Sequence, residues 1–223
     1  GAVVYHADIS QRKRVEMELQ AAAEQARLAH ADTVMMLAAS AEAHDQSTGQ
    51  HLRNVQALAE ALARELGHSE EAVGEIGLAA VLHDIGKIRV PKAILLSPDQ
   101  LSPTEWAVVK QHTIWGAEFL SGRPAFELAA TVARHHHERW DGEGYPEALT
   151  GDDIPEEATI VAVADAFDAM THDRPYRPAL GVEEAVRRIV ACSGKQFSPK
   201  VVVALQRLHY QDHADRRHRE DRD

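Results

Sequence analysis

The stretch Val81-Leu82-His83-Asp84-Ile85-Gly86-Lys87-Ile88 decides the fold, because it places an imidazole and a carboxylate side by side at the end of an apolar helical run. Residues four apart share one face of a helix, so the sequence predicts that His83 and Lys87 point at the same object. Asp84 would reach that object from about 100° around the helix axis. Since a buried carboxylate needs a compensating partner, this stretch predicts a bound metal ion.

The composition of the 223-residue chain is that of a globular protein, because 44% apolar residues are enough for a substantial core. No run of about 18 or more apolar residues occurs, so neither a membrane span nor a signal peptide is predicted. The formal net charge of −11 argues against general binding to nucleic acid or to an anionic membrane surface. Cys192 is the only cysteine, which excludes an internal disulfide and a thiolate-cluster metal site and favours a reducing cytoplasm.

The N-terminal part of the chain predicts a short strand over residues 1–9 and a signalling helix over residues 10–43, which Ser10 would cap. Small and apolar residues of this helix follow the a/d spacing of a coiled coil: Val15, Leu19, Ala22, Ala26, Ala29, Thr33 and Met36. The spacing predicts a parallel homodimer. The alternative is a single amphipathic helix that lies on the domain.

The remainder of the chain predicts an all-α domain over residues 44–210 and a frayed, charged tail over residues 211–223. Glycines and prolines in residues 138–155 predict a long functional loop. Helices are expected at residues 32–44, 48–66, 69–86, 103–121, 124–137, 156–171, 182–192 and 198–210.

Further ligand-type residues stand where the predicted helices begin or end or, as at His112, lie inside one, and together they are too many polar groups for an apolar core to satisfy by hydrogen bonds alone. Each of them alone would more often be a surface or hydrogen-bonded core residue. Nitrogen and oxygen donors suit Fe, Mn, Zn, Co or Ni better than Mg or Ca. With Asp84 as a bridge, two ions fit, one bound by His51, His83, Asp84 and Asp165 and the other by Asp84, His112, His136 and His137. A pair of metal ions is the usual apparatus for hydrolysing phosphate esters.

The order of these motifs resembles the HD phosphohydrolase superfamily and, in particular, its HD-GYP branch. The resemblance runs from about Asp45 to Pro199. It rests on His51, His83-Asp84-Ile85-Gly86-Lys87, His136-His137-Glu138, Asp141-Gly142-Glu143-Gly144-Tyr145-Pro146, Ile154-Pro155, Asp165, Arg174-Pro175-Tyr176-Arg177 and Gln196-Phe197-Ser198-Pro199. It implies an HD-type helical bundle and an enzyme that hydrolyses the bacterial messenger cyclic di-GMP to pGpG or GMP at a di-iron, di-manganese or similar centre.

The resemblance also implies roles for single residues. Lys87 would approach a phosphate of the substrate or the bridging hydroxide, and Tyr145, Arg174 and Arg177 would surround the cyclic dinucleotide. Members of the branch with a third metal carry a glutamate at the position of Ser47, so two metals are expected here. Whether Glu42 contributes to a third metal is open.

The expected reaction is the in-line attack of a hydroxide, which bridges the two ions, on a phosphorus of cyclic di-GMP. Asp84 would hold both ions, and Lys87 would take up negative charge. Two alternatives are open: hydrolysis of a related dinucleotide, such as cyclic GMP-AMP or pGpG, and a cyclic di-GMP-binding sensor that recruits a partner with little turnover.

Residues 8–16 resemble the exit of a PAS sensor domain, so residues 1–9 are expected to be the remnant of such an upstream domain. Gly1 in place of Met indicates a part of a longer protein. The expected location is the bacterial cytoplasm, with attachment to a membrane left open for segments beyond this sequence.

Overall fold

The computed structural model describes residues 2–42, 49–97, 99–173 and 178–220. This described part contains ten α-helices, three short 3-10 helices and two isolated β-bridges but no strand, which confirms the all-α prediction. In chain order the helices are α1 (Ala2–Glu42), α2 (Gly49–Glu65), α3 (Glu70–Leu82), η1 (Ile85–Arg89), α4 (Lys92–Leu95), α5 (Pro103–Lys110), α6 (His112–Leu120), η2 (Pro124–Phe126), α7 (Glu127–His135), η3 (Gly151–Asp153), α8 (Glu156–Thr171), α9 (Val182–Ala191) and α10 (Pro199–Glu220). Within the described ranges, none of them combines the length and apolar character that a bilayer crossing requires.

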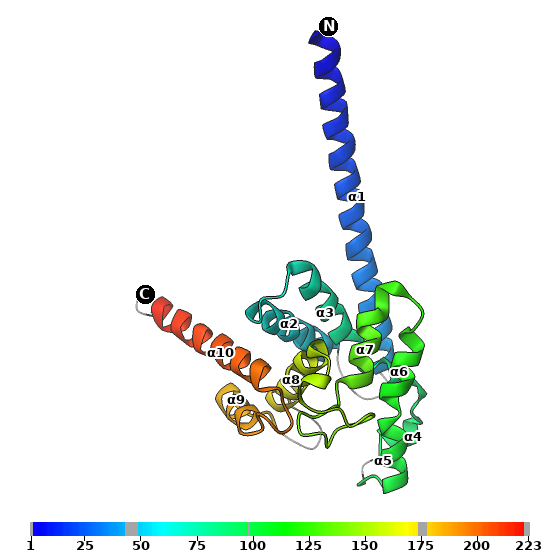
Figure 1. Cartoon of the computed structure of the whole chain (residues 1–223), viewed down its shortest axis with the longest axis vertical. Coiled ribbons are helices and arrows are strands. Elements are labelled where there is room, and N and C mark those ends of the chain that lie inside the picture. The colour runs from blue at the N-terminus through cyan, green and yellow to red at the C-terminus, as the bar shows by residue number, and fades with distance from the viewer. Residues whose placement is uncertain (1, 43–48, 98, 174–177, 221–223) are drawn as a thin grey trace.

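The hydrophobic core lies where α2, α3, α7 and α8 pack together (Figure 1). In α2, Leu52, Val55 and Leu62 recur at helical spacing and are fully buried, so one face of the helix supplies the core. Ile160 of α8 and Val132 of α7 are buried to the same extent. These four helices therefore form the rigid frame that positions side chains at their ends.

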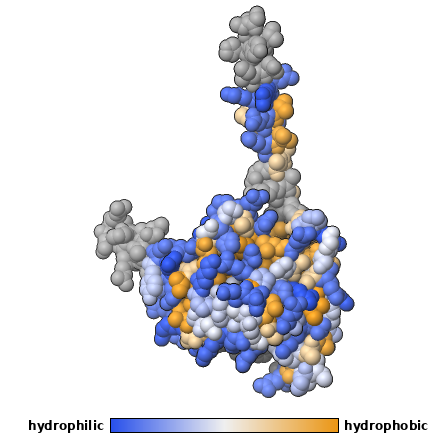
Figure 2. Space-filling view, in the orientation of Figure 1, coloured by the Kyte–Doolittle hydropathy of each residue, from blue (hydrophilic) through white to orange (hydrophobic). Residues whose placement is uncertain are grey.

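The two ends of α1 have different surroundings. Its N-terminal half stands out from the bundle (Figures 1 and 2), and Val15 and Leu19 there are 56% and 69% exposed. Near its C-terminal end, Val34, Ala38 and Ala41 are buried in the core of the domain. The last turns of α1 thus belong to the same core as the helices that follow.

The structure corrects the sequence prediction at both ends of the chain. Residues 2–9 are the first turns of α1 and not a strand, because a lone strand would leave its backbone groups without partners, whereas a helix pairs them internally. The tail does not fray after residue 210, because α10 continues to Glu220. Residues 211–220 contain no glycine or proline that would end the helix.

Two predicted helices are divided at the very positions that carry chemistry. The helix predicted at residues 69–86 ends at Leu82, and η1 begins at Ile85, so His83 and Lys87 do not lie on one continuous helix face as predicted. The helix predicted at residues 103–121 is split at Gln111 into α5 and α6. The physical reason for the first break is packing against α6. A Cβ atom on Gly86 would lie 1.9 Å from the carbonyl oxygen of His112, so the tight turn presses backbone against backbone.

Candidate metal centre

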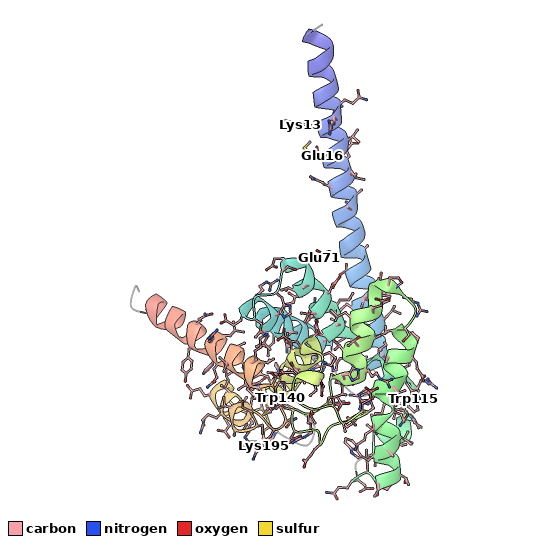
Figure 3. All side chains as sticks on the ribbon, viewed as in Figure 1. Lys13, Glu16, Glu71, Trp115, Trp140 and Lys195 are labelled. Atoms are coloured by element: carbon pink, nitrogen blue, oxygen red, sulfur yellow. The ribbon has the colours of Figure 1, made fainter. Side chains whose placement is uncertain are left out.

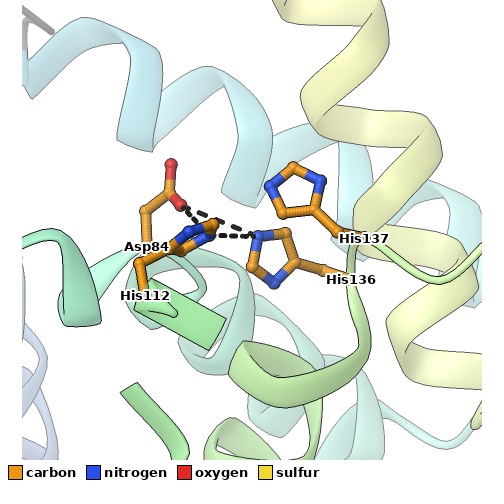
Figure 4. A group of neighbouring side chains, drawn as sticks. All are labelled: Asp84, His112, His136 and His137. Carbon is orange, nitrogen blue, oxygen red and sulfur yellow. Dashed lines mark hydrogen bonds and ion pairs between the residues drawn. The ribbon is translucent and has the colours of Figure 1, made fainter. Parts of the chain in front are cut away.

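Seven side chains that could hold metal ions converge at the ends of the packed helices. They form two groups, and within each group one ligand atom per residue lies within 4.8 Å of the others. The first group is His51, His83 and Asp165, and the second group, drawn in Figure 4, is Asp84, His112, His136 and His137. The structure therefore brings together every residue that the sequence predicted as a ligand, with Asp84, predicted for both ions, in the second group, while their binding of metal stays a prediction.

The ends of helices position most of these side chains. His83 follows the last residue of α3, and Asp84 precedes η1, so the break in the helix turns both side chains inward. His112 is the first residue of α6, and His136 follows the last residue of α7.

Asp84 lies between the two groups. Its Oδ1 is 3.2 Å from Nε2 of His112 and 3.6 Å from Nε2 of His136. Its Oδ2 is 3.2 Å from Nε2 of His83 in the first group and 2.8 Å from Nζ of Lys87. One oxygen thus faces each group, which is the arrangement that a bridging carboxylate requires.

Main-chain carbonyls orient three of the histidines. Nδ1 of His83 lies 2.7 Å from the carbonyl oxygen of Ala80. The corresponding distances are 2.6 Å from Nδ1 of His112 to Val109 and 3.0 Å from Nδ1 of His136 to Ala133. A carbonyl can only accept, so in each ring Nδ1–H donates and Nε2 is the nitrogen that faces the site. All three Nε2 atoms therefore face the position of a bound metal, and His83 would bind one after releasing its proton.

His51 is oriented by a side chain instead. Its Nδ1 lies 2.6 Å from Oδ2 of the buried Asp168, and its Nε2 faces Asp165 at 3.7 Å. Asp168 also accepts hydrogen bonds from Nδ2 of Asn54 at 2.8 Å and pairs with Nδ1 of His172 at 2.9 Å. Such a carboxylate fixes the orientation and tautomer of a ligand histidine. The sequence prediction missed Asp168, although its position three residues after Asp165 on one helix is a signal that could have found it.

The charges of the site suit metal ligands. Burial lowers the pKa of both His136 and His137, so these rings stay neutral. Burial would also lower the pKa of His83, but the carboxylates of Asp84 and Asp165 raise it to about 9. Burial would raise the pKa of Asp84, but Lys87 and His83 hold it well below its usual range. Asp84 is therefore ionised, as a bridging ligand must be.

Two buried atoms test whether the residues fit metal ions. Nε2 of His83 and Oδ1 of Asp84 make no hydrogen bond of acceptable geometry among the described residues. A buried polar atom without a partner costs about 1–3 kcal/mol, and a metal ion would remove that cost. Because the donors are all imidazole nitrogens and carboxylate oxygens, the site fits divalent transition-metal ions.

Two of the four predicted substrate-binding residues, Lys87 and Tyr145, lie in the described part of the chain. Lys87 is half-buried beside Asp84, and Tyr145 is half-buried with its ring stacked on that of His137, 4.8 Å between centroids and 28° between planes. Arg174 and Arg177 lie outside the described residues, as does Ser47.

The loop that carries Tyr145 is held by a buried carboxylate. Glu138 accepts hydrogen bonds from the backbone N–H groups of Glu147 at 2.7 Å and Leu149 at 3.1 Å. Gly144 packs against the same segment, because a Cβ atom there would lie 2.3 Å from the backbone nitrogen of Arg139. The loop therefore presents Tyr145 to the second group from a fixed base.

Comparison with known proteins agrees with this geometry. A family model described as an HD domain matches residues 32–201. The chain is 48% identical over 169 residues to a cyclic di-GMP phosphodiesterase from Thermotoga maritima, an alignment that covers 75% of this chain and 46% of the relative. It is 39% identical over 176 residues to 3′3′-cGAMP-specific phosphodiesterase 2 from Vibrio cholerae, covering 78% of this chain and 34% of that one.

Among solved structures, a cyclic GMP-AMP-specific phosphodiesterase from Vibrio cholerae superimposes with a TM-score of 0.62 at 19% identity. The superposition covers 81% of this chain and 48% of that one, and it shows a common fold. The chain spans less than half the length of both curated relatives named above.

Proposed function

The chain belongs to the HD-domain family, with the Gly-Tyr-Pro loop of its HD-GYP type, and on this premise we propose that it is a metal-dependent phosphodiesterase that hydrolyses cyclic di-GMP to pGpG or GMP. The observation that carries the proposal is the pair of ligand groups, each faced by one oxygen of Asp84. The relative from Thermotoga maritima supports the choice of substrate.

The chain's own residues would divide the work as follows. Asp84 joins the two groups, and His83, His112 and His136 turn Nε2 toward the site because Nδ1 of each donates to a main-chain carbonyl. Two divalent ions, with Fe or Mn favoured and Zn, Ni or Co as alternatives, would supply a bridging hydroxide that attacks phosphorus in line and would stabilise charge on the attacking and leaving oxygens. Lys87, 2.8 Å from Asp84, stands where its ammonium can bind a phosphate oxygen as negative charge develops.

Anaerobic turnover assays test this function. Protein loaded with Fe(II) or Mn(II) should convert cyclic di-GMP to pGpG or GMP, separated by chromatography, and a chelator should abolish the reaction. A metal-loaded protein that binds cyclic di-GMP without forming product would overturn the enzyme proposal in favour of the sensor alternative.

A second substrate has specific support, because the relative from Vibrio cholerae is named for 3′3′-cGAMP. A panel of cyclic di-GMP, cyclic GMP-AMP and pGpG at equal concentration would rank the substrates by kcat/KM. A preference for cyclic GMP-AMP would replace the substrate and leave the metal chemistry unchanged.

Two ions per chain are part of the proposal, because Ser47 stands where a third site would need glutamate. The side chain of Glu42 is not described, so its contribution to a third metal stays open. Metal analysis of anaerobically loaded protein should give two ions per chain, and a value of three would contradict the assignment.

We further propose a parallel homodimer through α1. Val15 and Leu19 are exposed on the projecting part of the helix, where Lys13 and Glu16 supply flanking charges (Figure 3). Sedimentation should give a dimer that Leu19→Glu converts to monomer, whereas a monomeric parent would contradict the proposal.

We also propose that a PAS sensor domain precedes this chain in the full-length protein and that the protein is located in the bacterial cytoplasm.

A further inference from the structure

The rim of the metal centre carries a lysine that the reaction above does not use. Lys110 is the last residue of α5, two positions before His112, and its side chain is half-buried. Its Nζ lies 5.0 Å from the centroid of the Tyr145 ring, within the range of a cation–π interaction. Tyr145 in turn stacks on His137 of the second group, so the ammonium is connected to the metal ligands through a single ring.

Lys110 differs from two neighbouring cations because its charge is not neutralised by a carboxylate of the described chain. Arg134 and Arg139 flank the same loop, but each forms an ion pair of 2.6 Å, with Glu147 and Asp141 respectively. In the described part of the chain, Lys110 forms no ion pair with a carboxylate.

The chemistry of a cyclic dinucleotide creates a need for such a cation. The molecule carries two phosphodiesters on opposite sides of its macrocycle, so the second one lies away from the metals when the first is bound there. The chain's net charge of −11 would repel this second anion unless a local cation compensates it.

We propose that Lys110 is a substrate-binding residue that contacts the phosphodiester not being cleaved, with Tyr145 holding the ammonium in place. This inference rests on the function proposed above. It adds a specificity determinant, because a substrate with one phosphodiester and no other phosphate has no group for Lys110 to bind.

Two substrates test the inference in the full, metal-loaded chain. Cyclic di-GMP has two phosphodiesters, and bis(p-nitrophenyl) phosphate has one. Lys110→Gln should raise KM for cyclic di-GMP about 10- to 100-fold with kcat nearly unchanged, as expected for loss of a charge-assisted hydrogen bond. The same variant should leave kcat/KM for bis(p-nitrophenyl) phosphate unchanged.

Two further variants serve as controls. Lys92→Gln removes an equal charge from an exposed position on α4 and should change neither substrate's kinetics. Lys110→Arg keeps the charge and should restore KM for cyclic di-GMP to within a few-fold of the parent.

The outcomes separate the possible failures. If the parent hydrolyses both substrates and Lys110→Gln leaves KM for cyclic di-GMP unchanged, the inference is wrong while the proposed function stands. If the variant loses activity equally on both substrates, Lys110 supports the site's structure and does not bind the second phosphate. If the metal-loaded parent hydrolyses neither substrate, the proposed function fails and the inference fails with it.

Discussion

The two ligand groups differ in what holds their histidines. In the second group, His112 and His136 donate to main-chain carbonyls, and the side chain of His112 is only 1% exposed. In the first group, His83 also donates to a main-chain carbonyl, but His51 depends on the side chain of Asp168, and Asp165 is 25% exposed. An anchor made by the main chain comes with the helix itself, whereas an anchor made by a side chain can be removed by one substitution. The two sites should therefore respond differently to mutation.

The largest effect should come from Asp84→Ala. Because Asp84 faces both groups, this substitution should affect both of them equally. We expect loss of both ions and of turnover, since each ion would lose its shared ligand. Metal analysis by mass spectrometry and the turnover assay measure this, with the exposed Asp99→Ala as the matched control. Turnover at the parent rate in purified Asp84→Ala protein would disprove the bridging role.

Asp168→Ala should separate the two groups. Without its carboxylate acceptor, His51 loses its orientation, and metal affinity at the first group should fall about 10- to 100-fold. The second group should keep its affinity, because main-chain carbonyls anchor His112 and His136 and none of its residues, all in the described part of the chain, contacts Asp168. A two-step calorimetric titration with Mn(II) would resolve the sites, with Asp152→Ala as the control. Equal weakening of both steps would show that the anchors do not act separately.

The candidate ligands that converge in the structure could be selected from sequence because each is a local signal at a predicted helix end or within a helix, such as the adjacent His83 and Asp84. The break after Leu82 could not, since it depends on the close approach of Gly86 to His112 from a helix distant in sequence. The spacing of Asp168 from Asp165 could have indicated a shared side of a helix, but its contact with His51 depends on the packing of α2 against α8.

At the two ends of the chain, the sequence prediction gave too much weight to local composition. The strand predicted over residues 1–9 was inferred from local composition, but no partner strand exists among the described residues, and helical hydrogen bonds replace it. Charge alone likewise predicted a frayed tail, although a chain segment without glycine or proline can extend an existing helix.

A smaller effect concerns pH at the first group. In the metal-free chain the pKa of His83 is raised to about 9, so the imidazole keeps its proton at neutral pH. That protonation stabilises the metal-free fold fully below a pH of 6.5, and the contribution is lost as the pH rises through about 9. Metal must displace the proton, so affinity should rise roughly tenfold per pH unit up to that pKa.

Calorimetry in buffers of different ionisation enthalpy measures this proton directly. Mn(II) binding near neutral pH should release about one proton on account of His83. The Asp168→Ala variant should release the same proton, since Asp168 contacts His51 and not His83. Binding without proton release would contradict the raised pKa.

The smallest effect should come from Asn54→Ala. Asn54 donates to Asp168 at 2.8 Å, but Asp168 keeps its contacts with His51 and His172. Loss of one hydrogen bond of about 1 kcal/mol should lower metal affinity at the first group only a few-fold. The same Mn(II) titration measures it. An effect as large as that of Asp168→Ala would mean that Asn54, and not the carboxylate, positions His51.

In evolutionary terms, the contact at Gly86 restricts how this protein can change. A side chain at this position would meet the backbone of His112 at 1.9 Å and that of Gly116 at 2.5 Å, so any replacement requires a simultaneous shift of α6. That helix carries His112, and Gly86 follows Asp84 by two residues, so the shift would move two ligands at once. Lineages that acquire a new substrate should therefore do so through the loop that carries Tyr145 and leave this turn untouched.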